Sequence, residues 1–517
     1  MVWTGQEIET ATGAAHSAAR LAEMRVDAVC TDSRRAAPGT LFVALRGARH
    51  DGHDFAAQTL RAGAAAVLVD RLPDGVDPER ALIVPDTLRA LGDLAAYTRR
   101  RWGGPVAAVT GSNGKTTTKD MLSAICEHAK SGGHANASSL SVAPASVPGG
   151  GAQRRPARQR RATGRDAGAT KTEMTRTGEV LSTHANENNL IGVPLTLLRL
   201  TGDERVAVLE MGMNAPGEIA RLTEIATPDV GLITNVGPAH LEGLGSVAGV
   251  AAAKGELFAG MRRDATIAVN MDDEWVVRVA GGFPGRRIEF GQGREVTASA
   301  IDDRGFDGIA FTLHVGTQRA PVRLHMAGRH NVQNALGAAA VAHALGLDVA
   351  AIAAGLGAAT PPAMRMTVIR LANGVTVVND AYNANPASTE AALAAIARTA
   401  GRPIAVLGEM RELGAESAAL HRRVGAYAAT CGVRWLLAVG PQADEIAAGA
   451  RAAGTVLEVT ICADAAGAAA LLIERWQRGD AILVKGSRGA DTEDAVRRYG
   501  ARMAEVAARL AEAGGAA

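Results

Sequence analysis

The chain has 517 residues, of which 47% are hydrophobic, 21% charged and 3% aromatic, and its formal net charge is +2. Residues 149–176 alone carry a net charge of +6, so the rest of the chain is net acidic. This distribution argues against a nucleic-acid-binding protein, because such proteins spread basic charge over a folded face. The length predicts two to four domains, with cores built mainly from aliphatic side chains.

The cysteines and the hydropathy pattern predict a cytoplasmic protein. The four cysteines form no CxxC pair and no zinc-type cluster with histidine, which favours reduced thiols. No apolar run reaches 18 residues, and the first residues show no signal-peptide pattern. We therefore expect no membrane insertion.

Residues 1–100 are predicted to form a small α/β domain. Residues 31–47 predict a turn and a short strand, and residues 53–70 predict a helix that leads into a strand. A further strand and helix are predicted over residues 81–102.

Residues 105–126, PVAAVTGSNGKTTTKDMLSAIC, predict a strand, a glycine-rich loop and a helix. Such a loop turns backbone N–H groups and a helix N-terminus toward phosphates. We expect Lys115 to reach the β- and γ-phosphates of a nucleotide and Thr116 to bind Mg²⁺. The alternative is a plain turn with a surface lysine, since Val109 replaces the first glycine of the full motif. The predicted nucleotide-binding loop comprises Gly111, Ser112, Asn113, Gly114, Lys115, Thr116 and Thr117.

Residues 130–180 form an atypical basic segment, rich in glycine, serine, proline and arginine. The segment lacks apolar periodicity, so we predict a disordered insertion. The alternative is the nucleic-acid contact of a phosphate-loop protein, which the lack of interleaved aromatic residues disfavours.

Two apolar strands after this segment end in polar residues. RVAVLEMGMN contains Glu210, and DVGLITNVG is followed by His240. The carboxyl ends of parallel strands share one edge of a sheet, so both side chains are candidates for binding Mg²⁺ beside the phosphate loop. Taken alone, each could equally be a capping or surface residue. Lys254, on an alanine-rich helical stretch, reads by itself as a solvated lysine.

Further candidates lie on a later helix and strand. Asn331 and Asn334 share one helix face, from which they could contact an adenine edge. Asp380 and Tyr382 follow a strand, where a nucleotide or peptide contact is plausible. Helix and turn capping are the alternatives for these residues.

Residues 363–517 are predicted to form a third domain. Strand patterns alternate with alanine-rich helices, which predicts a second, Rossmann-like parallel sheet. These strands lie within residues 375–383, 402–410, 434–440 and 480–489. The predicted fold class of the whole chain is therefore α/β.

The motifs together resemble the Mur ligases, the ATP-dependent amide-forming enzymes of peptidoglycan precursor synthesis. They occur in the family's order: TGSNGKTTT, LEMG, GPAHLEG, AAKGELF, RHNVQNALGA, RM at 365–366 and NDAYNANPAS. The resemblance implies a UDP-substrate domain over 1–100, an ATP-binding domain over 101–362 and a Rossmann-like ligase domain over 363–517. It also implies a monomer.

Within the family, NENNLIGVPLTLLRL from Asn186 resembles the members that join D-alanyl-D-alanine to a UDP-N-acetylmuramoyl-tripeptide. The chain lacks the DNPR motif of the members that add the third amino acid. A ligase of that second type and a folylpolyglutamate-type synthase stay as alternatives. The tripeptide can end in diaminopimelate or lysine.

The resemblance implies a role for each matching residue. Lys115, Glu210, His240, Lys254 and Arg365 correspond to the catalytic group. Thr116, Glu210, His240 and Lys254, the last as a carbamate, would hold two Mg²⁺ ions. Asn331, Asn334, Arg365 and Asp380 would contact ATP. The implied substrate contacts are Ser33, Arg34, Asn188, Asn189, Tyr382, Asn383, Lys485 and Ser487.

Overall fold

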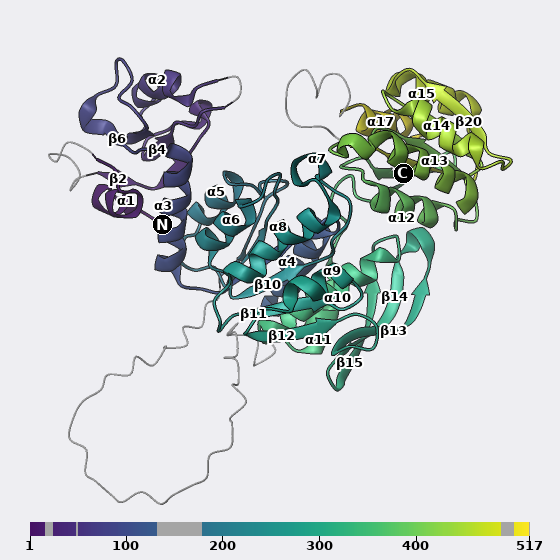
Figure 1. Ribbon diagram of the computed structural model, residues 1–517, viewed down its shortest axis with the longest axis horizontal. Coiled ribbons are helices and arrows are strands. Elements are labelled where there is room, and N and C mark those ends of the chain that lie inside the picture. The colour runs from purple at the N-terminus through teal and green to yellow at the C-terminus, as the bar shows by residue number, and fades with distance from the viewer. Residues whose placement is uncertain (16–23, 48–49, 132–177, 488–500, 516–517) are drawn as a thin grey trace, which may run out of the picture.

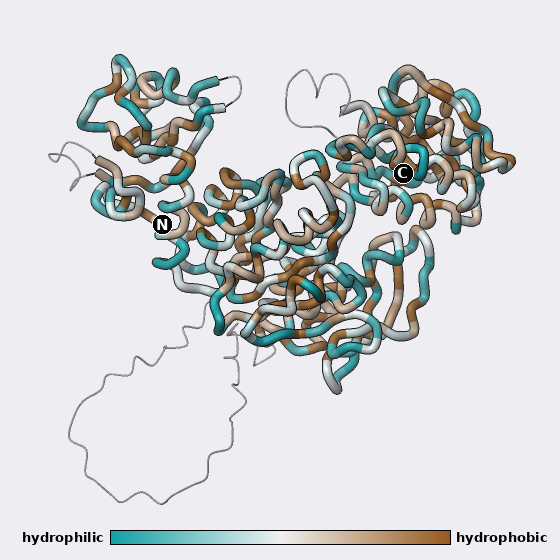
Figure 2. The backbone as a smooth tube through the Cα atoms, in the orientation of Figure 1, coloured by the Kyte–Doolittle hydropathy of each residue, from teal (hydrophilic) through white to brown (hydrophobic). Residues whose placement is uncertain are grey.

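The computed structural model describes residues 1–15, 24–47, 50–131, 178–487 and 501–515. The described elements form three units, with the central one between the other two (Figure 1). Hydrophobic segments are concentrated inside each unit (Figure 2). The predicted α/β class with parallel sheets is confirmed.

The N-terminal unit has a parallel sheet in the order β3-β4-β5-β6 and a small antiparallel pair, β1 and β2. Its strands are β1 (Trp3–Thr4), β2 (Arg25–Val26), β3 (Ala28–Cys30), β4 (Thr40–Val43), β5 (Ala66–Val69) and β6 (Ala81–Ile83). Its helices are α1 (Gly5–Thr12), α2 (Ala56–Arg61) and α3 (Thr87–Trp102). The long helix α3 packs against the central unit, where Arg99 pairs with Asp229 at 2.9 Å.

The central unit contains a nine-stranded sheet in the order β15-β14-β13-β12-β11-β10-β7-β9-β8. Its strands are β7 (Val106–Thr110), β8 (Val180–Ser182), β9 (Val206–Glu210), β10 (Val230–Ile233), β11 (Thr266–Asn270), β12 (Arg286–Phe290), β13 (Val296–Asp303), β14 (Ile309–Val315) and β15 (Gln318–Leu324). Its helices are α4 (Lys115–Ser131), α5 (Gly192–Leu198), α6 (Glu218–Ala226), α7 (Leu241–Leu244), α8 (Val247–Gly260), α9 (Glu274–Ala280), α10 (His330–Ala344) and α11 (Val349–Ala358).

The middle of this sheet is covered on both faces. Every residue of β7, β9, β10 and β11 is buried, as expected of parallel strands between two helical layers. Helices α4, α10 and α11 share one hydrophobic core with the sheet, and α5, α6 and α8 share another. The strands β7, β9 and β10 are parallel, so their carboxyl ends meet at one edge.

The C-terminal unit has a six-stranded sheet in the order β16-β17-β21-β18-β19-β20, in which only β16 is antiparallel. Its strands are β16 (Thr367–Arg370), β17 (Thr376–Asp380), β18 (Arg402–Leu407), β19 (Trp435–Val439), β20 (Glu458–Cys462) and β21 (Asp480–Lys485). Its helices are α12 (Pro386–Ile396), α13 (Ser417–Cys431), α14 (Ala443–Ala452), α15 (Ala465–Arg475) and α17 (Ala501–Gly514).

The predicted insertion over 130–180 is narrower at its edges than the sequence suggested. The helix α4 continues to Ser131, anchored by the buried Ala129, and β8 begins at Val180 because it pairs with β9. Residues 132–177, which include the arginine-rich stretch, lie outside the described residues. Among the helices that are described, none is long and apolar enough to cross a membrane.

Candidate active site

The glycine-rich loop joins β7 to α4 at the edge where the central strands end. Gly111 has φ +147° and Gly114 has φ +79°, conformations that side chains rarely adopt. A Cβ atom at Gly111 would overlap Thr234 Oγ1, and one at Gly114 would overlap Asn334 Oδ1. The loop is therefore packed so closely that both positions require glycine.

Two residues that follow β10 hold this loop in place, and sequence reasoning missed both. The backbone N–H of Asn113 donates to Asn235 Oδ1 at 2.9 Å, and the hydroxyl of Thr234 donates to the carbonyl of Asn113 at 2.5 Å. The available signal was the polar pair immediately after a buried strand. Because β10 lies next to β7, such a pair faces the loop.

Lys115 begins α4 and folds back over the loop, where its ammonium donates to the carbonyl of Gly111 at 2.7 Å. Desolvation lowers the pKa of Lys115, while the carboxylates of Glu210 and Glu412 act to raise it. The lysine thus lies within electrostatic reach of two acidic groups from different units.

A cavity of about 470 Å³ opens beside the loop, between the central and C-terminal units. This volume falls in the range of small-molecule sites. The cavity brings together predicted residues from distant parts of the chain: Ser112, Asn113, Gly114, Lys115, Thr117, Asn331, Asn334, Arg365, Asp380, Tyr382, Asn383 and Lys485. It also contains residues that were not predicted, among them Asn270, Asp272 and Gln333.

The two predicted adenine-side asparagines are bonded to each other. Asn334 Nδ2 donates to Asn331 Oδ1 at 2.9 Å, and Asn331 Nδ2 donates to the carbonyl of Ala327 at 2.8 Å. Nearby, Gln333 Nε2 donates to Asn270 Oδ1 at 2.8 Å and to Asp272 Oδ2 at 3.0 Å. These amides form a fixed polar wall at the start of α10.

The carboxylate of Glu210 is buried and has one oxygen without a partner among the described residues, as a ligand to a cation would have. The side chain is 2% exposed, and Oε1 accepts a hydrogen bond from Asn188 Nδ2 at 2.8 Å. Its other oxygen, Oε2, is buried without a hydrogen-bond partner among the described residues. A buried carboxylate oxygen without a partner is costly, which suits a site that a cation completes.

The remaining predicted metal ligands have partners of other kinds. His240 Nδ1 lies 2.6 Å from Glu412 Oε2, and Thr116 Oγ1 accepts a hydrogen bond from Arg365 Nη2 at 2.9 Å. Within the described part of the chain, no group of three or more His, Cys, Asp or Glu side chains is arranged to hold a metal. Mg²⁺ here would therefore need phosphate oxygens as further ligands, as is usual for this ion.

Lys254 is buried rather than solvated, which corrects the expectation from the residue alone. It is 1% exposed, and within the described ranges no carboxylate lies within ion-pair distance of its ammonium. Burial, together with the charge of Lys115, holds its pKa well below the usual value. Burial therefore disfavours the charged form of this amine.

The C-terminal unit reaches the phosphate loop directly. Besides its bond to Thr116, Arg365 stacks on the ring of Tyr382 at 4.1 Å. Asn385 Nδ2 donates to Asn113 Oδ1 at 2.7 Å, a contact that the sequence did not predict. The two units are therefore closed on one another around the cavity.

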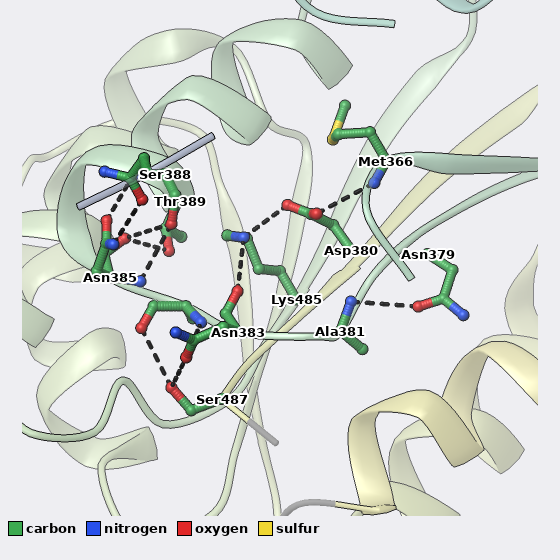
Figure 3. A network of polar contacts seen from close by, with 12 residues as sticks. Met366, Asn379, Asp380, Ala381, Asn383, Asn385, Ser388, Thr389, Lys485 and Ser487 are labelled. Carbon is green, nitrogen blue, oxygen red and sulfur yellow. Dashed lines mark hydrogen bonds and ion pairs between the residues drawn. The ribbon is translucent and has the colours of Figure 1, made fainter. Parts of the chain in front are cut away.

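Asp380, Lys485, Asn383 and Ser487 belong to one network (Figure 3). Lys485 Nζ donates to Asp380 Oδ2 at 2.6 Å and to the carbonyl of Asn383 at 3.0 Å. Ser487 Oγ lies 3.1 Å from Asn383 Oδ1. These groups are occupied by one another, so the substrate contacts proposed for Lys485 and Ser487 stay predictions.

Five of the eight predicted substrate contacts do not line the cavity: Ser33, Arg34, Asn188, Asn189 and Ser487. Ser33 and Arg34 form an exposed turn after β3, where Arg34 pairs with Asp32 at 2.8 Å. This partner lowers the pKa of Asp32 to about 2. The side chain of Asn189 accepts backbone N–H groups from Ile191 and Gly192, so it caps the start of α5.

Three family models match the chain. The Mur ligase middle domain matches residues 109–342, the Mur ligase glutamate ligase domain matches residues 364–488, and the Mur ligase family catalytic domain matches residues 25–99. These segments correspond to the three units of the structure.

Curated relatives match over most of the chain. The UDP-N-acetylmuramoyl-tripeptide–D-alanyl-D-alanine ligase of Escherichia coli (strain K12) is 37% identical, over 92% of this chain and 94% of that protein. The protein of the same name from Bacillus subtilis (strain 168) is 32% identical, over 91% and 93%.

Solved structures of Mur ligases are also similar to this chain. MurF from Acinetobacter baumannii superposes with a TM-score of 0.82 at 31% identity, covering 99% of both chains. MurF ligase from Thermotoga maritima in complex with ADP gives 0.72 at 25% identity, covering 92% of this chain and 98% of that one. With its phosphate loop, its three units, these family models and these relatives, the chain belongs to the Mur ligase family.

Proposed function

We propose that this protein joins D-alanyl-D-alanine to UDP-N-acetylmuramoyl-tripeptide, with hydrolysis of ATP to ADP and phosphate, in peptidoglycan precursor synthesis. This proposal rests mainly on the match of nearly the whole chain to ligases of that name. The geometry supports a nucleotide reaction, because a phosphate loop and Arg365 from the following segment meet at one cavity.

The residues that line the cavity fit a nucleotide, and residues outside its lining, near Lys115, fit Mg²⁺. The glycine loop and the start of α4 suit phosphates, and the amides of Asn331 and Asn334 suit the base. Glu210, His240 and Thr116 would hold the metal, and the partnerless Oε2 of Glu210 fits that role. Mg²⁺ would supply neutralisation of negative charge on the phosphates.

In the proposed chemistry, the free carboxylate of the tripeptide's third residue attacks the γ-phosphorus of ATP, and ADP leaves. The resulting acyl phosphate has a good leaving group. The neutral amine of D-alanyl-D-alanine then attacks the acyl carbon, phosphate leaves with the bonding electron pair, and the nitrogen loses its extra proton. Lys115 and Arg365 would stabilise the charge that develops on the phosphoryl oxygens.

Closure of the C-terminal unit serves this reaction in two ways. It brings Arg365 into contact with Thr116, and the hydrogen bond between Asn385 and Asn113 joins the C-terminal unit to the phosphate loop. A closed cavity also excludes water, which would otherwise hydrolyse the acyl phosphate.

The carbamate of Lys254 and a second Mg²⁺ ion are part of the proposal. Only an uncharged amine adds CO₂, and burial favours that form of Lys254. The addition releases a proton and converts a potential cation into an anion, which would help to hold metal beside Lys115.

We further propose that the enzyme is a monomer in the cytoplasm. One chain supplies all the groups described above, and its four cysteines are free, as expected in a reducing compartment. Phosphate release should be measured with ATP, Mg²⁺, D-alanyl-D-alanine and UDP-muramoyl-tripeptides ending in diaminopimelate or in lysine. Release that depends on both substrates, with a pentapeptide product by mass spectrometry, is expected from one or both tripeptides.

Two controls make this test decisive. Lys115→Ala should abolish phosphate release, whereas Arg100→Ala, on an exposed position of α3, should not. Turnover with a single amino acid or glutamate in place of the dipeptide would instead favour the related ligases. Normal turnover by the Lys115 variant would contradict the mechanism.

A further inference from the structure

The contact between His240 and Glu412 joins two unusual backbone positions. His240 has φ +55° and Glu412 has φ +61°, in the left-handed region that residues other than glycine seldom occupy. Their side chains meet across the boundary of the central and C-terminal units, with 2.6 Å between Nδ1 and Oε2; this is an ion-pair distance, at an angle outside the range of a hydrogen bond. Strained residues that persist in pairs at a site point to a functional constraint.

The loop that carries Glu412, residues 408–414, is fixed within the C-terminal unit. The backbone N–H of Met410 donates to Nε2 of the buried His421 at 2.8 Å, and that of Arg411 donates to Ser487 Oγ at 3.2 Å. Leu413 is buried in the core of the same unit. The position of the Glu412 carboxylate is thus set by the C-terminal sheet.

His240 belongs to the central unit, where it is the residue before α7. The first turn of α7 contacts this loop, since the N–H of Glu242 donates to the carbonyl of Glu412 at 3.4 Å. His240 Nδ1 therefore lies against a carboxylate of the other unit. Among the described residues, its Nε2 has no hydrogen-bond partner or ion pair.

We propose that Glu412 is a positioning residue that orients His240 for metal binding when the C-terminal unit closes. A histidine that binds a metal through one nitrogen commonly donates the other N–H to a carboxylate, which fixes the ring. Here that carboxylate is on a different unit from the histidine, so closure and metal affinity are coupled. The proposal rests on the ATP- and Mg²⁺-dependent function proposed above.

The competing explanation is that the contact between Glu412 and His240 only holds the two units together and has no effect on metal binding. Two other ion pairs join the same units away from the cavity: Arg370 with Asp307 at 2.6 Å, and Arg398 with Asp303 at 3.5 Å. If Glu412 served only as a latch, removal of one of these pairs would have the same effect on metal binding. Arg370→Ala is therefore the matched control for closure, and Glu416→Gln, on a nearby exposed turn, is the control for charge.

The test is Mn²⁺ binding to the full chain with a non-hydrolysable ATP analogue, followed by electron paramagnetic resonance. We expect Glu412→Ala to weaken Mn²⁺ binding about 10- to 100-fold. Glu412→Gln should lose less, because its amide oxygen can take the place of the carboxylate oxygen beside the ring N–H. Arg370→Ala and Glu416→Gln should stay within about twofold of the parent. In a His240→Ala background, Glu412→Ala should have no further effect.

Several outcomes would overturn the proposal. Unchanged Mn²⁺ affinity in both Glu412 variants would do so, as would equal losses in Glu412→Ala and Arg370→Ala, or additive losses with His240→Ala. Melting curves identify a variant that fails to fold. If Glu412→Ala does not fold, Glu412→Gln is used to test the proposal. Metal binding is measured without tripeptide or dipeptide, so a failure of the proposed ligase specificity would leave this result standing.

Discussion

The carboxyl edges of the central and C-terminal sheets look alike in sequence but differ in how their polar groups are satisfied. At the central edge, Glu210 Oε2 has no partner and Lys254 has no carboxylate, within the ranges that the structure describes. At the C-terminal edge, Lys485 pairs with Asp380, and both ring nitrogens of His421 are hydrogen-bonded.

This difference suggests that the central edge binds ligands, whereas the C-terminal edge holds its own loops in position. A buried polar group without a partner destabilises the fold, so its presence indicates a ligand that completes it. A satisfied network stabilises its own loops instead. The C-terminal network fixes the loops that bring Asn385 to the phosphate loop and Glu412 to His240. We expect substitutions at the first edge to affect activity and those at the second to affect stability.

The largest effect is expected from Lys254→Met, which removes a buried amine of the central edge. The reaction rate should fall roughly a thousandfold, equivalent to about 4 kcal/mol, because a charge-organising group is lost. The free energy of unfolding should not decrease, since no ion pair is broken. Phosphate release and urea unfolding measure the two quantities. In Lys254→Ala, a short-chain carboxylate such as formate should restore part of the activity; full activity without it would rule out the carbamate.

The same substitution at the other edge, Lys485→Met, should instead lower the stability of the fold. It leaves the carboxylate of Asp380 buried without its cation, which typically costs about 3 kcal/mol of stability. The free energy of unfolding in urea should fall by that amount. Asp380→Asn combined with Lys485→Met should recover part of it, because the stranded charge is gone. If the free energy of unfolding of Lys485→Met equals that of the parent protein, the proposed difference between the two edges is wrong.

Two glycines at equivalent places, after β7 and after β19, provide a milder comparison. Gly440→Ala has open space, so only the strain at φ +91° opposes it, about 1 kcal/mol. Gly111→Ala shares that type of strain and also forces a Cβ into Thr234, so it should cost about 3 kcal/mol and abolish phosphate release. Thermal unfolding and the activity assay together check this. Equal effects of the two substitutions would show that the loop tolerates displacement.

The sequence predicted that the glycine loop, Lys115 and Glu210 lie near one sheet edge, because these signals are local; their roles toward a nucleotide stay predictions. A strand, a glycine loop and a lysine appear consecutively, and Glu210 ends a neighbouring apolar strand. The α/β class followed from the same alternation of strand and helix patterns. Lys254 was different: its alanine-rich surroundings say nothing of burial, and only the family resemblance indicated its role.

The contacts between units could not be predicted in this way. Asn385 and Glu412 lie 272 and 172 residues from their respective partners, Asn113 and His240, and no periodicity connects such pairs. The pairing of Lys485 with Asp380 depends on β17 and β21 being neighbours in the sheet, although they are far apart in the chain. Tertiary arrangement decides which polar residues are satisfied, so the sequence could not separate the two edges.

The smallest effect concerns His421, which holds the loop of Glu412 in the C-terminal unit. Burial lowers the pKa of this imidazole, against weaker opposing effects from the carbonyl of Ser417 and the carboxylates of Glu409 and Glu445. The unfolded chain therefore takes up a proton at higher pH than the folded protein does. The stability that the neutral ring provides is complete above about pH 6.5 and is lost as the pH falls below that value, by up to about 1 kcal/mol per pH unit. Urea unfolding at pH 7.5 and pH 5.5 should show a smaller difference for His421→Gln than for the parent protein; an equal difference would mean that this ring does not titrate on unfolding.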